Sequence, residues 1–204
     1  MQLFMIMGVA MSKLYFRYGA MNSSKTANAL MVKYNYEERG QKVLLMKPSI
    51  DSRDGKCTLS SRAGLKEECL PIEKDDNIYE MVCEYVELNS PVNAVIVDEA
   101  QWLTKAQVYH LTRLVDEKKI PVICYGLRAD FRGELFEGSQ YLLAWADTIE
   151  EIKTICWCGK KAIMNARYHG DIILKEGEQI EVGGNDRYIS LCRAHWHEGV
   201  LSGK

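Results

Sequence analysis

A stretch near the N-terminus has the spacing of a phosphate-binding loop. Residues 19–26 read Gly-Ala-Met-Asn-Ser-Ser-Lys-Thr and follow a strand-like run at 13–18. They differ from the pattern G-x-x-x-x-G-K-[ST] only at Ser24, which stands where the pattern has glycine. The backbone N–H groups of such a loop, with the N-terminus of the next helix, bind phosphate. We expect Lys25 to reach the β- and γ-phosphates of a nucleotide and the Thr26 hydroxyl to bind Mg²⁺.

Strand-like apolar runs alternate with helical patterns in the first two thirds of the chain. The expected strands are 13–18, 42–46, 93–97 and 121–125, and the expected helices are near 25–38, 76–88 and 104–118. For residues 48–72 we expect an irregular excursion from the alternating pattern, that is, a connection without regular secondary structure. Strands that are apolar on both faces and separated by helices predict a parallel sheet covered by helices. With a phosphate loop after the first strand, the predicted fold is an α/β P-loop NTPase (RecA-like) sheet.

The length and composition allow a core with a small satellite domain. The chain has 204 residues, of which 47% are hydrophobic, and its net charge of −2 gives no basic field for binding duplex nucleic acid. We expect a nucleotide-binding core over 11–150 and a smaller domain over 151–204, where glycine, cysteine and charged residues become frequent. Residues 1–10 are apolar but too few to span a bilayer, so we interpret them as a leader or a start-site extension.

Two adjacent carboxylates follow the predicted strand at 93–97. Asp98 and Glu99 lie where a P-loop sheet carries the carboxylate that organises Mg²⁺. We expect Asp98 to hold Mg²⁺ through water and Glu99 to act as general base on an attacking hydroxyl. The alternative is a solvated acidic strand end that opens a helix, since acidic residues favour helix N-termini. Lys25 upstream favours the catalytic interpretation.

Three cysteines and a histidine near the C-terminus have the spacing of a metal site. Cys156 and Cys158 form one close pair, and Cys192 and His195 form another. Four such ligands fit a closed, tetrahedral and therefore structural Zn²⁺ site. His197 is an alternative fourth ligand, and reduced packing cysteines are the other interpretation. Zinc would join the two ends of the segment between the pairs.

That segment, 159–191, has features of a substrate lid. Gly183 and Gly184 are adjacent and Tyr188 follows them. A glycine pair is usually a turn. A long loop anchored by metal can also bring its backbone close to a ligand and cover it with a ring.

Taken in order, these motifs resemble those of type II thymidine kinases. The resemblance covers Met11 to about Trp196. It rests on Tyr18–Thr26, Asp98–Gln101, Tyr125–Gly133 and the Cys/His set that encloses Gly183–Tyr188. It implies transfer of the γ-phosphate of ATP, with Mg²⁺, to the 5′-hydroxyl of thymidine, with deoxyuridine as a second candidate substrate and Glu99 as the base.

The resemblance also implies two sets of binding residues. For ATP and Mg²⁺ these are Gly19, Ala20, Met21, Asn22, Ser23, Ser24, Lys25, Thr26, Asp51, Arg53, Asp98 and Gln101. For thymine they are Met21, Trp102, Leu127, Phe131, Val182, Gly183, Gly184 and Tyr188, the last four on or beside a lasso loop of the zinc-binding domain. Trp102 stands where many relatives carry Phe. The family implies a cytoplasmic homotetramer in nucleotide salvage that is inhibited by dTTP.

Two other functions fit part of the pattern. Asp-Glu-Ala-Gln at 98–101 is also a sequence motif of some helicases, so a nucleic-acid-stimulated ATPase is the alternative function. Such motors need two RecA-like lobes, whereas the predicted core supplies one, and the chain has no basic surplus for binding a phosphate backbone. A zinc-ribbon interaction module with a decayed phosphate loop is the third interpretation, and it depends on Ser24.

Overall fold

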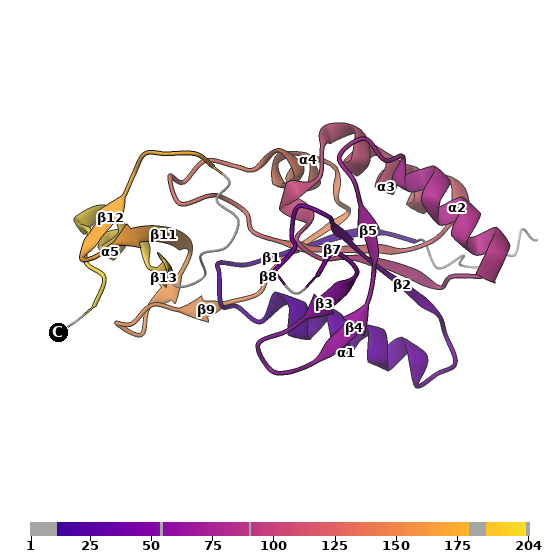
Figure 1. The fold of residues 1–204 in the computed structure, drawn as a ribbon, viewed down its shortest axis with the longest axis horizontal. Helices are drawn as coiled ribbons and strands as arrows, with labels where there is room; N and C mark the ends of the chain where they lie inside the picture. Colours follow the sequence, from indigo (N-terminus) through magenta and orange to yellow (C-terminus); the bar gives the residue numbers. More distant parts are fainter. Residues whose placement is uncertain (1–11, 54, 90, 180–186, 203–204) are drawn as a thin grey trace, which may run out of the picture.

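The computed structural model describes residues 12–53, 55–89, 91–179 and 187–202. Figure 1 shows a larger body built on a central sheet and a smaller C-terminal body beside one end of it. The expected leader at 1–10 lies outside the described residues. So do Val182, Gly183 and Gly184 of the expected lasso loop.

The larger body contains a six-stranded sheet in the order β5-β2-β6-β7-β1-β8, with every neighbouring pair parallel. Its strands are β1 (Leu14–Tyr18), β2 (Val43–Pro48), β5 (Leu70–Ile72), β6 (Ala94–Val97), β7 (Val122–Gly126) and β8 (Thr148–Glu151). The strands β6 and β7 are buried along their whole length, as expected for a sheet covered on both faces. The predicted α/β parallel sheet is confirmed.

Helices cover both faces of this sheet (Figure 1). They are α1 (Lys25–Glu37), α2 (Ile78–Asn89), α3 (Lys105–Lys118) and α4 (Glu137–Trp145). Ala29 and Leu30 of α1 pack on one face, while α2, α3 and α4 pack on the other through side chains such as Val82, Leu111 and Leu142. Nowhere in the described ranges does a helix combine the length and apolar character that a membrane span requires.

Residues 48–72 contain short strands, so the prediction of an irregular excursion there was wrong. The strands β3 (Thr58–Ser60) and β4 (Lys66–Glu68) form an antiparallel hairpin, and β5 joins the edge of the central sheet. Strands of three residues are too short to show a hydrophobic period. The β4 residues are all charged and exposed. Leu59 anchors the hairpin by packing in the core beside α1.

The C-terminal body has its own small sheets. Its elements are β9 (Thr154–Ile155), β10 (Lys161–Ala162), β11 (Met164–His169), β12 (Ile172–Leu174), β13 (Tyr188–Leu191) and α5 (Arg193–Glu198). Strands β9 and β10 form a hairpin, and β12, β11 and β13 form an antiparallel sheet. A core that includes Cys156, Ala166, Leu191 and Trp196 lies between them.

A short 3₁₀ turn after β6 packs closely against two glycines. The turn η1 (Ala100–Trp102) lies against α4 at Gly138, where an added Cβ would meet the carbonyl oxygens of Ala100, Gln101 and Leu103. At Gly126, the last residue of β7, an added Cβ would lie 2.7 Å from Oε1 of Gln101. The glycines therefore let the backbone of η1 approach the sheet, which fixes the residues that follow Glu99.

We expect Gly138→Ala to destabilise the fold. The new methyl would lie 2.9 Å from the Leu103 carbonyl oxygen and closer still to that of Ala100, and backbone atoms cannot move aside cheaply. The free energy of unfolding should fall by about 1–3 kcal/mol, although Ala is the better helix former. Urea unfolding measures this. Gln140→Ala, an exposed position of the same helix, serves as control and should change stability by less than about 0.5 kcal/mol. Equal stability of the two variants would show that the contact is not tight.

Candidate functional site

A cleft of about 770 Å³ lies at the carboxyl ends of the central strands. Ligands of parallel α/β sheets bind at this edge. The predicted residues that line it are Met21, Asn22, Ser23, Ser24, Lys25, Thr26, Asp51, Arg53, Asp98, Glu99, Gln101, Trp102, Leu127, Phe131 and Tyr188. Gly19 and Ala20 lie behind this lining, in the bend that leaves β1. The structure thus brings most of the predicted site residues together around one cleft.

Lys25 lies buried at the centre of the phosphate loop. Its Nζ donates to the carbonyl oxygens of Gly19 (3.2 Å) and Ala20 (3.0 Å) and lies 3.4 Å from the Ser23 hydroxyl. Burial lowers the pKa of Lys25, and the nearby carboxylates of Glu99 and Asp98 oppose this. The ammonium is thus held beside the loop backbone, where it can turn toward a phosphate.

Ser24 adopts the conformation that explains why the loop pattern has glycine there. Its φ is 60° and its ψ is 30°, in the left-handed region, and its side chain makes no capping hydrogen bond to α1. Asn22 has a similar φ of 61°. Left-handed backbone is costly for most L-residues and less so for Asn. The Ser24 side chain is exposed, so the serine strains the backbone without blocking the loop.

Asp98 joins the end of β6 to the phosphate loop. The Thr26 hydroxyl donates to Oδ2 of Asp98 at 2.7 Å. Asp98 is buried, and burial together with the charge of Glu99 raises its pKa to about 6, while the Thr26 hydrogen bond acts in the opposite direction. A hydroxyl and a carboxylate at this distance can both reach one cation, which is the arrangement of a Mg²⁺ site beside a phosphate loop.

Glu99 is held in place by two side chains. Nη2 of Arg53 lies 2.6 Å from Oε1 of Glu99, and Nε2 of Gln101 donates to its Oε2 at 2.5 Å. Nε of Arg53 also donates to Asp51 at 2.6 Å. Burial opposes the charge of Arg53, but the two carboxylates outweigh it and raise the pKa of the guanidinium. Glu99 itself has a φ of 50°, a strained backbone of the kind found at functional sites.

The structure adds a buried lysine that the sequence reasoning did not select. Lys47 is 1% exposed, and its Nζ lies 3.5 Å from Oδ2 of Asp51. It lies within β2, the strand that pairs with β6. The available sequence signal was a charged residue within an apolar strand run, near its carboxyl end.

The C-terminal body holds the phosphate loop at Met21. The backbone N–H of Met21 donates to Oδ1 of Asn165 at 2.8 Å, and the hydroxyl of Ser190 donates to the Met21 carbonyl oxygen. Asn165 and Ser190 are paired neighbours on β11 and β13. Nδ2 of Asn165 also donates to the carbonyl oxygen of Ala129 at 2.9 Å. No local motif marks Asn165 or Ser190, because their partners are far away in the sequence.

The same body supports Phe131, one of the expected pocket residues. The guanidinium carbon of Arg167 lies 3.7 Å from the centre of the Phe131 ring, and Nε1 of Trp196 donates to the Phe131 carbonyl oxygen at 3.0 Å. Farther along the wall, Trp102 and Phe136 meet edge to face with ring centres 5.0 Å apart. Aromatic and apolar side chains thus form one part of the cleft wall, and its chemistry contrasts with the charged part around Lys25.

Cys156, Cys158, Cys192 and His195 come together as a possible metal site. One ligand atom from each lies within 4.8 Å of the others, and Sγ of Cys156 is 3.4 Å from Nδ1 of His195. Tetrahedral metal–sulfur and metal–nitrogen bonds require ligand separations of about 3.5–3.8 Å. Burial raises the pKa of Cys156, but backbone N–H donors of Cys158 and Cys192 outweigh it and lower that pKa to about 6, which favours the thiolate.

The neighbourhood distinguishes the two candidate histidines. His195 belongs to the cluster, and its ring stacks on Trp157 with centres 4.2 Å apart. The ring of His197 instead meets Trp196 edge to face, and within the described residues His197 is not a member of the cluster.

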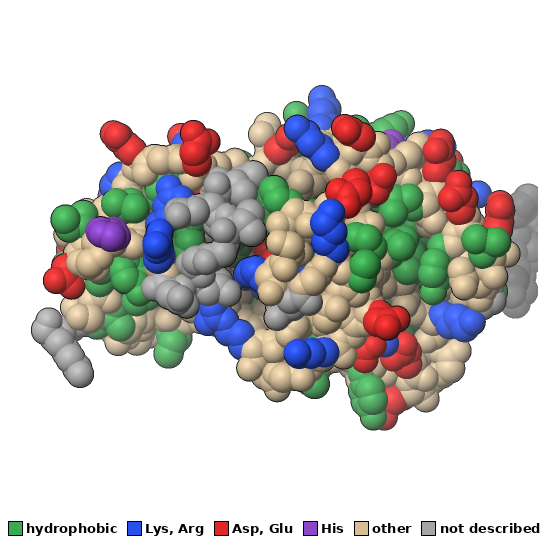
Figure 2. All heavy atoms as spheres, in the orientation of Figure 1, with side chains coloured by type: hydrophobic (Ala, Val, Ile, Leu, Met, Phe, Trp, Pro, Cys, Tyr) green, Lys and Arg blue, Asp and Glu red, His purple; other side chains and the backbone are tan. Residues whose placement is uncertain are grey.

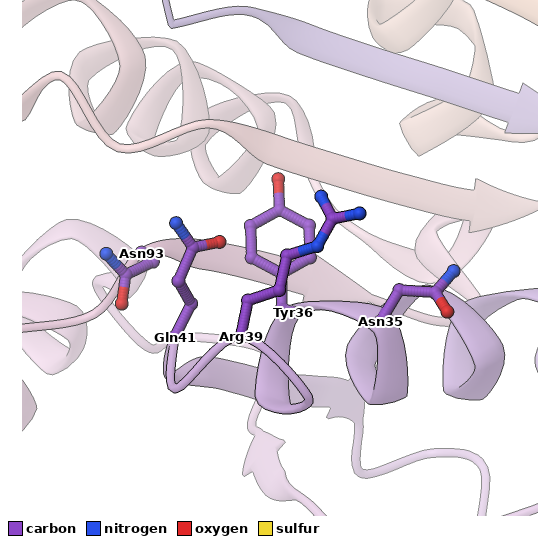
Figure 3. Close-up of a pocket in the computed structure, with 5 residues that line it drawn as sticks. All are labelled: Asn35, Tyr36, Arg39, Gln41 and Asn93. Carbon is purple, nitrogen blue, oxygen red and sulfur yellow. The ribbon is translucent and has the colours of Figure 1, made fainter.

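A second cavity, of about 400 Å³, lies at the amino ends of the central strands, opposite the first cleft. Figure 3 shows its lining of Asn35, Tyr36, Arg39, Gln41 and Asn93. It lies where α1 ends and where β2 and β6 begin, so it is at the amino ends of the strands. The Asn93 side chain already accepts a hydrogen bond from the Lys42 backbone at 2.8 Å. Parallel sheets bind ligands at their carboxyl ends, so the first cleft is the candidate site.

Comparison with known proteins agrees with the geometry. A family model described as "Thymidine kinase" matches residues 12–196. The chain is 50% identical to a thymidine kinase of Legionella pneumophila (strain Paris) over 191 residues, which cover 93% of this chain and 91% of that one. It is 51% identical to one from Lactiplantibacillus plantarum over 187 residues, with 91% and 96% covered. With one from Pasteurella multocida it shares 46% identity over 192 residues, with 93% and 99% covered.

We expect Ser24→Gly to stabilise the protein and to preserve or improve its affinity for ATP. Glycine adopts the left-handed conformation at φ 60° without the cost of a Cβ, about 1 kcal/mol. The melting temperature should rise by about 2–4 °C for a chain of this size. Calorimetric melting and ATP titration measure both effects.

Ser24→Ala is the matched control, because it removes the hydroxyl and keeps the strain. It should melt close to the unsubstituted protein. A tenfold or greater loss of ATP affinity in Ser24→Gly would show that the bend is adapted to serine, contrary to this expectation.

Proposed function

This chain belongs to the thymidine kinase family, and we propose that it transfers the γ-phosphate of ATP to the 5′-hydroxyl of thymidine, giving dTMP. The observation that carries the proposal is the family match over residues 12–196. The relatives at about half identity over most of the chain bear the same name. Deoxyuridine is a further candidate substrate, and nucleotide salvage for DNA synthesis is the role that follows.

We propose that the core is a P-loop NTPase sheet that binds ATP and Mg²⁺ through residues 19–26. Lys25 binds the β- and γ-phosphates, and the backbone N–H groups of the loop supply further donors. Thr26 and Asp98, joined by a hydrogen bond of 2.7 Å, would hold Mg²⁺, Asp98 through water, and Gln101 would orient this region. When bound, Mg²⁺ neutralises phosphate charge. Asp51 and Arg53 lie beside the γ-phosphate in this proposal, because Arg53 already bridges Asp51 and Glu99.

Glu99 is the proposed catalytic base. Phosphoryl transfer needs positioning and charge neutralisation more than covalent chemistry. The carboxylate aligns the 5′-hydroxyl of the nucleoside and accepts its proton late in the transfer. Arg53 and Gln101 hold the Glu99 side chain in one rotamer by hydrogen bonds to Oε1 (2.6 Å) and Oε2 (2.5 Å). This supports the role, because a base that is already oriented loses little entropy on reaction.

The thymine pocket is proposed at the aromatic end of the cleft. Met21, Trp102, Leu127, Phe131 and Tyr188 surround a flat base there, and each lines the cleft. Backbone groups around 180–184 are expected to hydrogen-bond the base as a lasso loop, in a segment outside the described residues.

The cysteine–histidine cluster is proposed to hold structural Zn²⁺. Four protein ligands, Cys156, Cys158, Cys192 and His195, would fill a tetrahedral coordination shell and leave no position open for a substrate. Their spacing fits this geometry. These residues lie in the turn between β9 and β10 and at the start of α5, so Zn²⁺ held by them would join the two elements and stabilise a zinc-binding domain over 151–204 that carries the lasso.

The family resemblance supports three further proposals. The enzyme works in the cytoplasm, it assembles as a homotetramer, and dTTP inhibits it as the end product. Nucleic acid and membranes are not among its proposed partners.

The alternative, a nucleic-acid-stimulated ATPase, is not favoured. The described residues form one central parallel sheet, whereas such motors pair two lobes. On the face drawn in Figure 2, acidic and basic side chains are mixed over the larger body. The test is transfer from ATP·Mg²⁺ to a panel of nucleosides, with and without single-stranded DNA and RNA. Product confined to thymidine and deoxyuridine supports the kinase, whereas ATP hydrolysis that rises with nucleic acid, without nucleoside product, supports the motor.

We expect Glu99→Gln to lower kcat for thymidine by at least ~10²-fold, because the amide cannot accept the proton. Steady-state kinetics measure kcat, and ATP titration should give nearly unchanged affinity. Glu87→Gln, an exposed glutamate of α2, is the control and should retain full activity. A kcat near normal in Glu99→Gln would refute the role as base.

We expect Cys192→Ser to lose bound zinc and to loosen the C-terminal body. Removing one thiolate opens the tetrahedral site and weakens a core that is small without its metal. Metal analysis and limited proteolysis measure the two effects. Cys57→Ser, an exposed cysteine outside the cluster, should keep both properties. Unchanged zinc content in Cys192→Ser would exclude the site as drawn.

A further inference from the structure

Arg62 lies at the tip of the β3–β4 hairpin and lines the same cleft as Lys25, Asp98 and Glu99. We propose that its guanidinium binds the γ-phosphate of ATP and neutralises charge there during transfer. This rests on the proposed function, because it adds a catalytic residue to that reaction.

The backbone of the hairpin tip is fixed by a closed turn. The N–H of Gly64 donates to the Ser61 carbonyl oxygen at 3.0 Å, and the N–H of Ser61 donates to the Leu65 carbonyl oxygen at 2.9 Å. The Ser61 hydroxyl also accepts from the N–H of Leu65 at 3.1 Å. Gly64 supplies the positive φ of 87° that the turn needs. Arg62 therefore projects from a defined point, although its side chain is exposed.

The hairpin is anchored on the helix that begins at the phosphate loop. Leu59 is 2% exposed and packs in the same core as Ala29 and Leu30 of α1. Glu67 of β4 forms an ion pair with Lys33 of α1 at 3.1 Å. Since α1 starts at Lys25, one rigid element carries both the phosphate loop and the support of Arg62.

The charge of Arg62 reaches the phosphate end of the cleft. Burial is the main cause of the lowered pKa of Lys25, and the positive charges of Arg53 and Arg62 add to it. The tip residues Ser60, Ser61 and Arg62 line the cleft together with the first turn of α1. Arg62 thus lines the cleft close enough to Lys25 for the two charges to interact.

Arg62 is the cleft cation that the described residues leave without a partner. The cations that line the cleft are Lys25, Lys47, Arg53 and Arg62. Lys25 bonds to loop carbonyls, Lys47 pairs with Asp51, and Arg53 pairs with Asp51 and Glu99. For Arg62, no ion pair or hydrogen bond to the described residues is found. A triphosphate adds negative charge to this end of the cleft, and an arginine fork suits phosphate oxygens.

The experiment compares Arg62→Gln with the matched control Lys66→Gln. Lys66 is an exposed cation of the same hairpin that does not line the cleft. Titration calorimetry with ATP·Mg²⁺ and ADP·Mg²⁺ gives the two affinities, and steady-state kinetics give kcat for thymidine. In Arg62→Gln we expect about tenfold weaker ATP binding with ADP binding changed less than about twofold, and kcat lowered at least about tenfold. Arg62→Lys should recover part of the ATP affinity, since it keeps the charge and loses the fork. Lys66→Gln should match the unsubstituted protein.

Two results would overturn the inference. Equal losses for ATP and ADP would mean that Arg62 contacts no γ-phosphate, and unchanged affinity and kcat would mean that it contacts no phosphate. If Arg62→Gln fails to fold, the same comparison in Arg62→Lys decides, because the loss of the fork should weaken the preference for ATP over ADP, and an unchanged preference overturns the inference. Failure of the proposed function is distinct, because the unsubstituted protein would then phosphorylate no nucleoside, whatever Arg62 does to nucleotide affinity.

Discussion

Parallel pairing of β1, β6 and β7 is the constraint on which the site depends. The pairing places the end of β1, where the phosphate loop starts, beside the ends of β6 and β7. Asp98 can therefore accept the Thr26 hydroxyl at 2.7 Å across 72 residues of sequence. Side chains alternate between the two faces of a strand, so a one-residue slip of β6 would exchange the positions of its buried residues and displace Asp98 and Glu99. Val95, Ile96 and Val97 are fully buried, so such a slip would also force their side chains to repack.

Backbone strain is concentrated around the cleft. Asn22, Ser24 and Glu99 all have positive φ values, of 61°, 60° and 50°, and all three line it. Such conformations persist when surrounding bonds over-determine them. For Glu99 these bonds are the ones to Arg53 and Gln101, together with the close packing of η1 against Gly126 and Gly138. Strained backbone that lowers the stability of the fold thus places the Glu99 carboxylate and the phosphate loop around the same cleft.

The parts of the structure that were predictable from sequence are those with local signals. The strands near 42–46, 93–97 and 121–125 are mostly buried and apolar, and the strand near 13–18 alternates Leu14 and Phe16, which are buried, with less buried residues. Each was therefore found within about two residues of its observed bounds. The β3–β4 hairpin was missed, since Lys66, Glu67 and Glu68 give no alternation. Asn165 was missed for another reason. Its partner Met21 lies 144 residues away, and a single polar residue in a strand does not reveal a contact at that separation.

The hydrogen bonds of Asn165 and Ser190 to Met21 connect the order of the phosphate loop with that of the C-terminal body. Both polar groups of one loop residue are satisfied by β11 and β13, so the phosphate loop is tethered to the small C-terminal sheet as well as to its own strand. In the proposed enzyme, a nucleotide that ordered the loop would also order that sheet, and Zn²⁺ held by the cysteine–histidine cluster would order the loop. Such coupling is reciprocal, because each occupant must raise the affinity for the other by the same factor. Metal retention and nucleotide affinity would then be two readings of a single thermodynamic cycle.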